Sequence, residues 1–293
     1  MVHDVVLSGQ LSGRLYNILG LVRDCSNWGE VVLRYTISPK RSITFKFRDG
    51  TSRQVENWSE GSWYLASQEY ARISRALGDH NNNDLGEFEA LVSHVIRMVK
   101  SLDATERMKL GGGVGRKEAL LFAVIRRSMP KKIIETGVAS GISTSFILKA
   151  LDLNGFGELK SIDFPNFDKD FVTRYDRVID ATHTPPRLGV GWIVPENLRG
   201  RWQLTIGKSH DVLPQLTGDV DLFVHDSEHS YANMMFEFEW AHQHLKPQGL
   251  LVSDDVLFND AYSDFKVTHK DMREPFRVPN VGFLRKNKPG SYH

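Results

Sequence analysis

Glycine, acidic and histidine residues recur directly after short apolar runs in the second half of this 293-residue chain. The first run leads into residues 135–143, where Glu135 precedes two glycines, Gly137 and Gly141, in a Gly-x-x-x-Gly spacing. Glycines in such a turn let a ligand approach bare backbone at the N-terminus of a following helix. The spacing differs from the Gly-x-Gly-x-x-Gly of dinucleotide binders, and the preceding acid suits a ligand with an ammonium group or a ribose.

Two further runs end in polar residues that could contact a nucleoside. Asp163 lies 26 positions beyond Gly137, where a ribose-binding carboxylate falls in nucleotide-type folds. A carboxylate accepts two hydroxyl hydrogen bonds at once, although Asp163 could equally cap a turn at Pro165. After the next run, Ser209 either lies beside an adenine ring or, like Asp211, caps the short helix that follows.

Three carboxylates and a histidine follow the last two runs. Asp226 and His229 come after residues 222–225, and Asp254 and Asp255 come after residues 250–253. Burying so much like charge is costly unless a cation or ligand compensates it. Oxygen ligands of this kind suit magnesium, manganese or calcium. The alternative is two independent helix caps or turns in solvent.

The elements that must position these residues are short strands alternating with helices. Strands are expected at 133–135, 159–162, 202–206, 222–225, 250–253 and 281–285, and helices at 117–127, at 231–245 and from 262. This alternation predicts an α/β fold with a parallel sheet covered on both faces, whose ligands bind beyond the carboxyl ends of the strands.

The first 110 residues differ in character and predict a small α+β extension ahead of a domain spanning 111–293. Strands are expected at 31–38 and 43–48, helices at 63–77 and 87–99, and an exposed loop at 79–84. The extension is either a structural cap or dimerisation surface, or a substrate-recognition element. Residues 164–200 form a long insertion that either closes as a lid over a ligand or packs as a helix on the body.

Composition narrows the class of protein. A formal net charge of +1 gives no reason to expect nucleic acid or a membrane surface as a partner. The single cysteine, Cys25, excludes an internal disulfide framework. Neither a spanning apolar stretch nor a signal-peptide pattern is present, which predicts a cytoplasmic protein.

In order, the motifs are Glu-Thr-Gly-x-x-x-Gly-x-Ser, Ser-Ile-Asp, Gly-x-Ser-x-Asp-x-Leu-Pro, Asp-x-x-His-x-Tyr and Leu-Lys-Pro-x-Gly-x-Leu-x-x-Asp-Asp. Together they resemble a class I S-adenosylmethionine-dependent methyltransferase over residues 115–286. Within that family the chain is most similar to small-molecule O-methyltransferases of the catechol and macrocin types. The resemblance implies a doubly wound, mostly parallel, seven-stranded Rossmann-like sheet.

The resemblance also implies roles for single residues. Asp163 would hold the ribose of S-adenosylmethionine, Ser209 would lie beside its adenine, and Asp226 would also contact the cofactor. His229 stands where catechol-type enzymes carry a lysine base, so His229 and Asp226 are the expected catalytic pair. The methionine end of the cofactor would be faced by Glu135, Gly137, Val138, Ala139, Gly141 and Ser143. Mg²⁺ or another divalent cation would be bound by Asp226, Asp254 and Asp255.

The expected activity is methyl transfer to a hydroxyl of a small-molecule acceptor, such as a sugar or glycan precursor, with or without a divalent metal. The alternatives are a metal-independent N- or C-methyltransferase and a non-catalytic S-adenosylmethionine-binding protein. A homo-oligomer remains open. One departure from the family pattern is Gln248, which stands where a second glycine is usual before the fifth strand.

Overall fold

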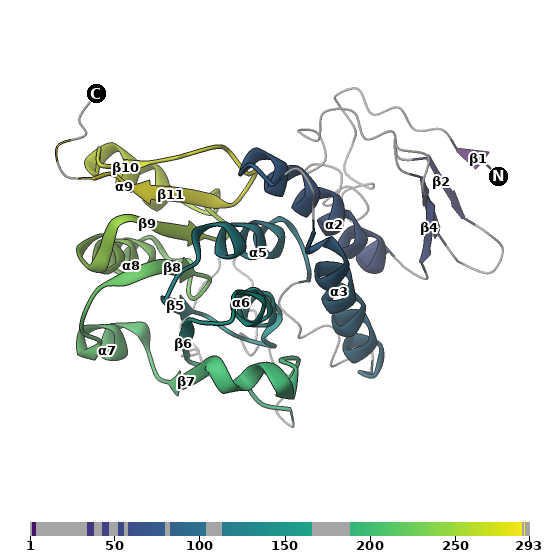
Figure 1. Cartoon of the computed structure of the whole chain (residues 1–293), viewed down its shortest axis with the longest axis horizontal. Coiled ribbons are helices and arrows are strands. Elements are labelled where there is room, and N and C mark those ends of the chain that lie inside the picture. The colour runs from purple at the N-terminus through teal and green to yellow at the C-terminus, as the bar shows by residue number, and fades with distance from the viewer. Residues whose placement is uncertain are drawn as a thin grey trace.

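A seven-stranded sheet forms the centre of the molecule, in the order β10-β11-β9-β8-β5-β6-β7 (Figure 1). The five strands from β9 to β7 run parallel, whereas β11 pairs antiparallel with both β9 and β10. The strands are β5 (Lys132–Thr136), β6 (Glu158–Asp163), β7 (Trp202–Ile206), β8 (Val220–His225), β9 (Leu245–Ser253), β10 (Met272–Arg273) and β11 (Gly282–Lys286).

The structure is a computed structural model, and it describes residues 2–3, 34–37, 43–46, 52–55, 58–79, 83–103, 113–165, 188–288 and 290. Side chains are described from residue 65 onward. The predicted boundary at residue 110 and most of the predicted insertion, residues 166–187, lie outside the described residues.

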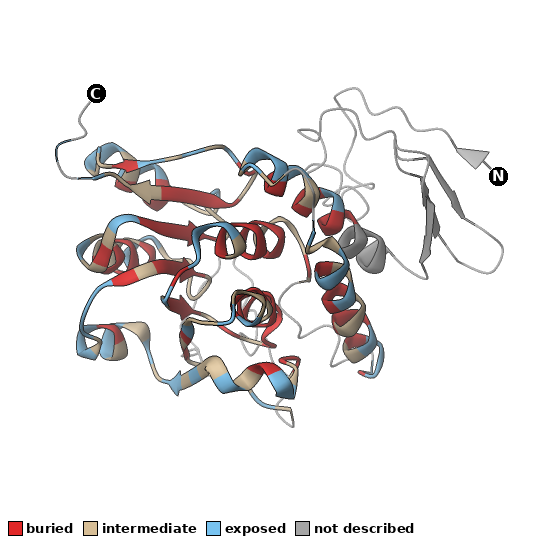
Figure 2. Cartoon of the chain, in the orientation of Figure 1, coloured by how far each residue is buried: buried red, intermediate tan, exposed pale blue. Residues whose placement is uncertain are grey.

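Helices cover both faces of the sheet. They are α5 (Arg116–Ser128), α6 (Ile142–Asn154), α7 (Ser209–Val212), α8 (Tyr231–His244) and α9 (Ala261–Thr268), with 3₁₀ turns η1 (Glu196–Arg201) and η2 (Leu213–Gln215). Successive residues of a strand point to opposite faces of the sheet and belong to two separate cores. Ile133 belongs to the core under α5 and α6, whereas Ile134 belongs to the core under α8 and α9. This two-residue period explains why the central parallel strands β5 and β8 consist largely of apolar residues, which Figure 2 shows as buried.

The order in which the chain adds strands to the sheet reverses at β5. From β5 the chain goes on to β6 on one side, and β8 pairs with β5 on the other side. Such a switch point leaves a crevice beyond the carboxyl ends of the two strands, where ligands of open α/β folds bind. The glycine loop after β5 and the acidic segment after β8 therefore meet at one edge of the sheet.

The elements predicted within the described residues correspond to observed ones. The main differences in length are the helix Trp58–Ala76, which begins five residues before its predicted start, and β9. Strand β9 begins at Leu245, five residues before the predicted start, and includes Gln248 with a positive φ of 71°. A left-handed backbone conformation favours glycine. Gln248 therefore adopts the conformation that explains why a glycine is usual at this place.

The N-terminal part contains an antiparallel sheet and two helices. The sheet has the order β1-β2-β3-β4, with β1 (Val2–His3), β2 (Arg34–Ile37), β3 (Ile43–Lys46) and β4 (Ser52–Val55). The helices are α2 (Trp58–Ala76) and α3 (Leu85–Lys100), and they lie beside α5 and α6 in Figure 1. In the described residues, no helix is both long and apolar enough to cross a membrane.

Four aromatic rings join α2 and α3 to the central sheet's helices. Tyr70 stacks on Phe88 at a centroid distance of 5.0 Å, and Phe88 contacts Phe122 at 5.4 Å and Phe146 at 4.8 Å. All four side chains are at most 1% exposed. The two N-terminal helices therefore share one core with α5 and α6.

Replacement of Phe88 by alanine tests this shared core. Phe88→Ala is expected to cost about 3–5 kcal/mol of unfolding free energy, because it leaves a cavity among three other rings. Urea unfolding followed by fluorescence and circular dichroism measures the change. Leu257→Ala is the control, since Leu257 is 69% exposed and its loss should matter by less than about 0.5 kcal/mol. A separate unfolding transition for the helices, with the main transition unchanged, would contradict the shared core.

Candidate active site

The glycine loop after β5 lies directly against the chain that leaves β8. Gly137 has a φ of 84°, and a Cβ added there would lie 1.9 Å from the carbonyl oxygen of Asp226. The amide of Gly137 donates to the Ile162 carbonyl at 2.9 Å, so the loop also continues the pairing with β6. Only glycine meets both requirements, and it brings the loop next to the acidic segment.

Residues 191–194 pack against the other side of the glycine loop. Gly191 N donates to Ala139 O at 2.9 Å, and Ile193 N donates to Ser140 O at 3.0 Å. A Cβ on Gly141, whose φ is 89°, would lie 2.8 Å from the Cα of Gly191. The loop is thus packed on both sides by backbone, which limits the shapes that it can adopt.

Asp163 fastens the loop to the end of β6. Its Oδ2 accepts hydrogen bonds from the amides of Val138 at 2.7 Å and Ala139 at 2.6 Å, and Asp163 is only 8% exposed. Asp163, which the sequence predicted to bind a ribose, therefore lies beside the glycine loop and forms hydrogen bonds with the backbone of that loop.

The side chain of Glu135 lies inside the protein and contacts residues next to the glycine loop. It is fully buried and accepts hydrogen bonds from the hydroxyls of Ser143 at 2.9 Å, Thr144 at 2.8 Å and Ser161 at 2.7 Å. Burial raises the pKa of Glu135 to about 7, against the opposing effect of these hydroxyls. Glu135 and Ser143, both predicted to face the cofactor, bond to each other here and tie β5 to the first turn of α6.

A lysine that sequence reasoning missed lies between two of the predicted metal ligands. Lys117 Nζ donates to Asp226 Oδ2 and, at 2.9 Å, to Asp254 Oδ2. Burial lowers the pKa of Lys117, but the charges of Asp226, Asp254 and Glu118 outweigh it and hold that pKa well above its usual value. The ammonium group of Lys117 therefore compensates the negative charges of the aspartates that the sequence placed at the carboxyl edge of the sheet.

One signal in the sequence could have pointed to Lys117. It is the second residue of α5, where the helix dipole disfavours a cation. Because α5 leads into the amino end of β5, its own N-terminus lies at the carboxyl edge of the sheet. A lysine at that position needs a nearby anion, and the strand-end aspartates are the anions at that edge.

Asp255, the third predicted metal ligand, is held elsewhere. It has a φ of 48°, and its Oδ1 accepts a hydrogen bond from Asn280 Nδ2 at 2.7 Å. The structure thus brings Asp226 and Asp254 together around Lys117, whereas Asp255 contacts the loop before β11.

His229 lies next to a buried network on the α8 side of the sheet. Its ring packs edge-on to His225 at a centroid distance of 5.1 Å, and its Nε2 is buried without a hydrogen-bond partner in the described part of the chain. Burial, and then the His225 charge, lower the pKa of His229 to about 3. His229 is therefore neutral at neutral pH and can accept a hydrogen bond, but it is a poor proton acceptor.

The network next to His229 is organised by Glu237. This fully buried carboxylate pairs with His225 Nδ1 at 2.6 Å and accepts the hydroxyl of Ser227 at 2.7 Å. Asn233 donates to Ser227 Oγ at 3.0 Å and accepts from Ser209 Oγ at 3.2 Å. Ser209, predicted to lie beside an adenine, is thereby linked to the segment after β8.

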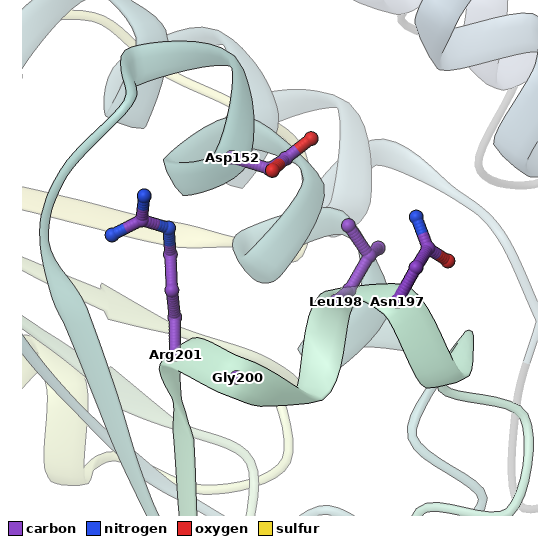
Figure 3. A pocket seen from close by; sticks show the side chains of 5 residues that line it. All are labelled: Asp152, Asn197, Leu198, Gly200 and Arg201. Atoms are coloured by element: carbon purple, nitrogen blue, oxygen red, sulfur yellow. The ribbon is translucent and has the colours of Figure 1, made fainter.

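A surface pocket lies away from these residues (Figure 3). It is lined by Asp152, Asn197, Leu198, Gly200 and Arg201. Asp152 belongs to the last turns of α6, and the others belong to η1, which leads into the start of β7. The pocket is therefore at the amino edge of the sheet, opposite the glycine loop, and none of the predicted site residues lines it.

Comparison with known proteins agrees with this arrangement. Residues 134–256, from β5 to just past Asp255, match the family model of a methyltransferase domain. No curated protein matches the chain in sequence. Residues 134–256 are therefore similar to a methyltransferase domain, in line with the resemblance of the sequence motifs.

The chain is similar in fold to solved structures of methyltransferases. The O-methyltransferase NovP aligns with a TM-score of 0.50 and 13% identity, over 68% of this chain and 98% of NovP. SAH-bound PaMTH1 from Podospora anserina aligns at 0.48 and 14%, over 80% and 99%. TomG from Streptomyces achromogenes, in complex with SAM, aligns at 0.40 and 18%, over 71% and 79%. At 13% identity the likeness to NovP concerns the fold alone, and the observed seven-stranded sheet is the one that the sequence predicted.

Gly137→Ala is expected to weaken S-adenosylmethionine binding about tenfold or more, because its methyl group would collide with the Asp226 carbonyl. Gly155→Ala is the matched control: its φ of 78° carries a similar backbone strain of about 1–2 kcal/mol, but nothing lies within 4 Å of an added Cβ. Calorimetry measures affinity and thermal unfolding measures stability for both variants. Equal affinities would contradict a role of the Gly137 contact in the site.

The raised pKa of Glu135 predicts a dependence of stability on pH. The folded protein keeps this proton up to about pH 7, whereas the unfolded chain releases it near its ordinary value of 4.5. Stability should therefore fall by about 3 kcal/mol as the pH rises through that window and stay level above it. Urea unfolding at about pH 5 and about pH 8 measures this change. Glu135→Gln should flatten the slope, and the exposed Glu158→Gln should leave it intact; an unchanged slope in Glu135→Gln would refute the assignment.

Proposed function

We propose that this protein transfers a methyl group from S-adenosylmethionine to a hydroxyl oxygen of a small molecule. The observation that carries the proposal is the gathering of the glycine loop, Asp163 and the Asp226–Lys117–Asp254 cluster at the carboxyl edge of a methyltransferase sheet. NovP, whose fold is similar, is named an O-methyltransferase, which favours oxygen as the acceptor atom. From the resemblance of the motifs, the acceptor class is a sugar or glycan precursor.

The residues at this edge fit the cofactor. The loop from Gly137 to Gly141 presents backbone without bulky side chains, Asp163 lies beside it, and Ser209 begins the segment after β7. In the proposal the loop faces the methionine portion, Asp163 accepts from the ribose hydroxyls, and Ser209 lies beside the adenine. When bound, S-adenosylmethionine supplies a methyl group on a positively charged sulfur.

Lys117 takes the place predicted for a divalent cation in this proposal. The carboxylates as arranged do not fit a metal ion, because one oxygen of Asp226 and one of Asp254 bond to Lys117, and Asp255 bonds to Asn280. An ammonium held by two carboxylates can donate a hydrogen bond to an acceptor oxygen and stabilise the negative charge that develops on it. The reaction would then need no added metal.

Asp226 is the stronger candidate for the general base. Burial, together with the charge of Asp254, raises the pKa of Asp226 well above its usual value although Lys117 opposes this. A carboxylate with a raised pKa is a better proton acceptor for a hydroxyl. The acceptor proton would pass to Asp226, while His229, with a pKa of about 3, would accept a hydrogen bond that orients the acceptor.

Calorimetry with S-adenosylmethionine tests the cofactor assignment. Asp163→Ala should weaken binding at least about tenfold, because two hydrogen bonds to a charged group are lost. Asp211→Asn is the control, since Asp211 is an exposed acid in α7. Absence of binding by the wild-type protein would overturn the proposed function.

Activity with a panel of sugars and catechols, scored by the demethylated cofactor, tests the role of Lys117. Wild-type activity should survive a chelator, and Lys117→Met should lower it about 100-fold, because a preorganised charge is removed. Lys149→Met is the control, since Lys149 on α6 pairs with Glu87 on α3. Loss of wild-type activity with the chelator, restored by magnesium, would show that a metal and not Lys117 supplies the charge.

A further inference from the structure

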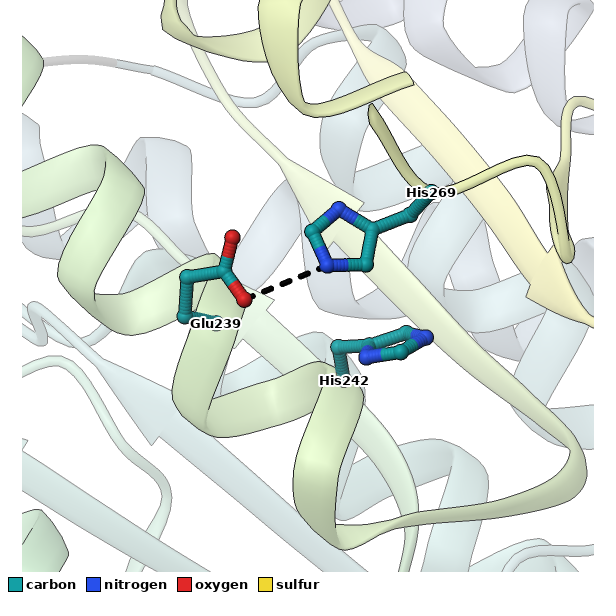
Figure 4. Close-up of side chains that lie close together, drawn as sticks. All are labelled: Glu239, His242 and His269. Carbon is teal, nitrogen blue, oxygen red and sulfur yellow. Dashed lines mark ion pairs between the residues drawn. The ribbon is translucent and has the colours of Figure 1, made fainter. Parts of the chain in front are cut away.

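Two histidines and a glutamate gather away from the proposed active site, where α8 meets the end of α9 (Figure 4). Glu239 and His242 lie three residues apart on α8, and His269 directly follows α9. One ligand atom from each of the three lies within 4.8 Å of the others. Glu239 and His242 are 8 and 11 residues beyond the start of α8, which is about 12–16 Å from the end of that helix next to the active site.

The hydrogen bonds of His269 leave one ring nitrogen available as a metal ligand. Its Nδ1 lies 3.2 Å from the carbonyl of Phe265, which can only accept, so Nδ1 carries a proton. The other nitrogen, Nε2, faces Glu239 Oε2 at 3.2 Å. In a neutral ring that nitrogen presents a lone pair to a carboxylate, and a cation between them removes the repulsion.

The rings are also fixed in orientation. His269 stacks on Phe265 at a centroid distance of 4.3 Å, and it lies 4.3 Å from the ring of His242. His242 Nε2 faces both carboxylate oxygens of Asp271, at 2.9 and 3.1 Å. A carboxylate that holds a histidine ring in this way is the usual support of a metal-binding imidazole.

The surroundings admit and favour a cation. The side chains of His269, His242 and Glu239 are 14%, 23% and 41% exposed, so an ion can enter from solvent. His242 lies in the last turn of α8, where the helix dipole favours positive charge. Two imidazoles and a carboxylate suit a borderline metal such as zinc rather than magnesium.

We propose that Glu239, His242 and His269 bind one zinc ion, with Asp271 as the residue that positions His242. Zinc bonds of about 2.0–2.2 Å in a tetrahedron place ligand atoms about 3.4 Å apart, so side-chain rotations close the present spacing. The ion joins α8 to the segment between α9 and β10. It braces the edge of the sheet and takes no part in methyl transfer.

Titration of the full-length, tag-free protein with zinc chloride tests the site after chelator treatment and dialysis. Calorimetry should give one equivalent bound, and the unfolding temperature should rise with zinc, because only the folded state assembles the three ligands. His242→Gln and His269→Gln should each weaken binding at least about tenfold, and Asp271→Asn should do so by a similar factor. His244→Gln is the matched control: it lies two residues from His242 on α8, and its Nδ1 already bonds to the Trp240 carbonyl.

A second readout covers variants that fold poorly. Cobalt added to the metal-free wild-type protein should give the visible absorption of a low-coordinate site, and zinc should abolish that absorption. Failure of the wild-type protein to bind zinc would overturn the proposal. So would zinc binding that His269→Gln and Asp271→Asn leave unchanged, because the ion would then lie elsewhere.

Discussion

The close approach of two backbone segments at the switch point of the sheet determines the rest of the site. Gly137 lies against the Asp226 carbonyl so tightly that no Cβ fits. The Asp226 amide donates to Thr136 O at 2.8 Å, and the Asp254 amide donates to His225 O at 2.9 Å, so the parallel pairing extends past both strand ends. The two aspartates therefore emerge side by side at the carboxyl edge. Any cation placed between them meets two carboxylates at once.

Lys117 fits that requirement because of the direction of α5. A helix that leads into the amino end of β5 must begin at the opposite edge, where the aspartates are. The helix dipole disfavours a lysine in this first turn, and the carboxylates offset that cost. The charge is thus in place before any acceptor arrives, which is the condition under which electrostatic stabilisation is most effective. A buried ammonium also stays protonated as long as its two partners remain ionised.

Much of the fold followed from local patterns. The strand predicted at 202–206 is β7 with the same bounds, and the strands predicted at 133–135 and 222–225 are parts of longer strands. The central parallel strands are buried on both faces, so most of their residues are apolar and the strands are easy to recognise. The start of β9 was less clear, because Lys246 and Gln248 are polar, a proline lies between them and Gln248 adopts a left-handed conformation. The sharing of a core by Phe88 and Phe146 left no local signal, since helix periodicity does not identify the partner helix.

By itself, the sequence determined the order of strands and helices and the polar residues that follow each strand, because strand burial and turn chemistry act within a few residues. It also determined that Asp163 and the glycine loop belong to one edge, since carboxyl ends of parallel strands meet there. Only the tertiary structure decided what each side chain faces. Glu135 turned inward to three hydroxyls, Asp255 turned to Asn280, and Lys117 came to lie between aspartates that are 109 and 137 residues away. Such contacts depend on how helices pack on the sheet, and spacing along the chain carries no record of that packing.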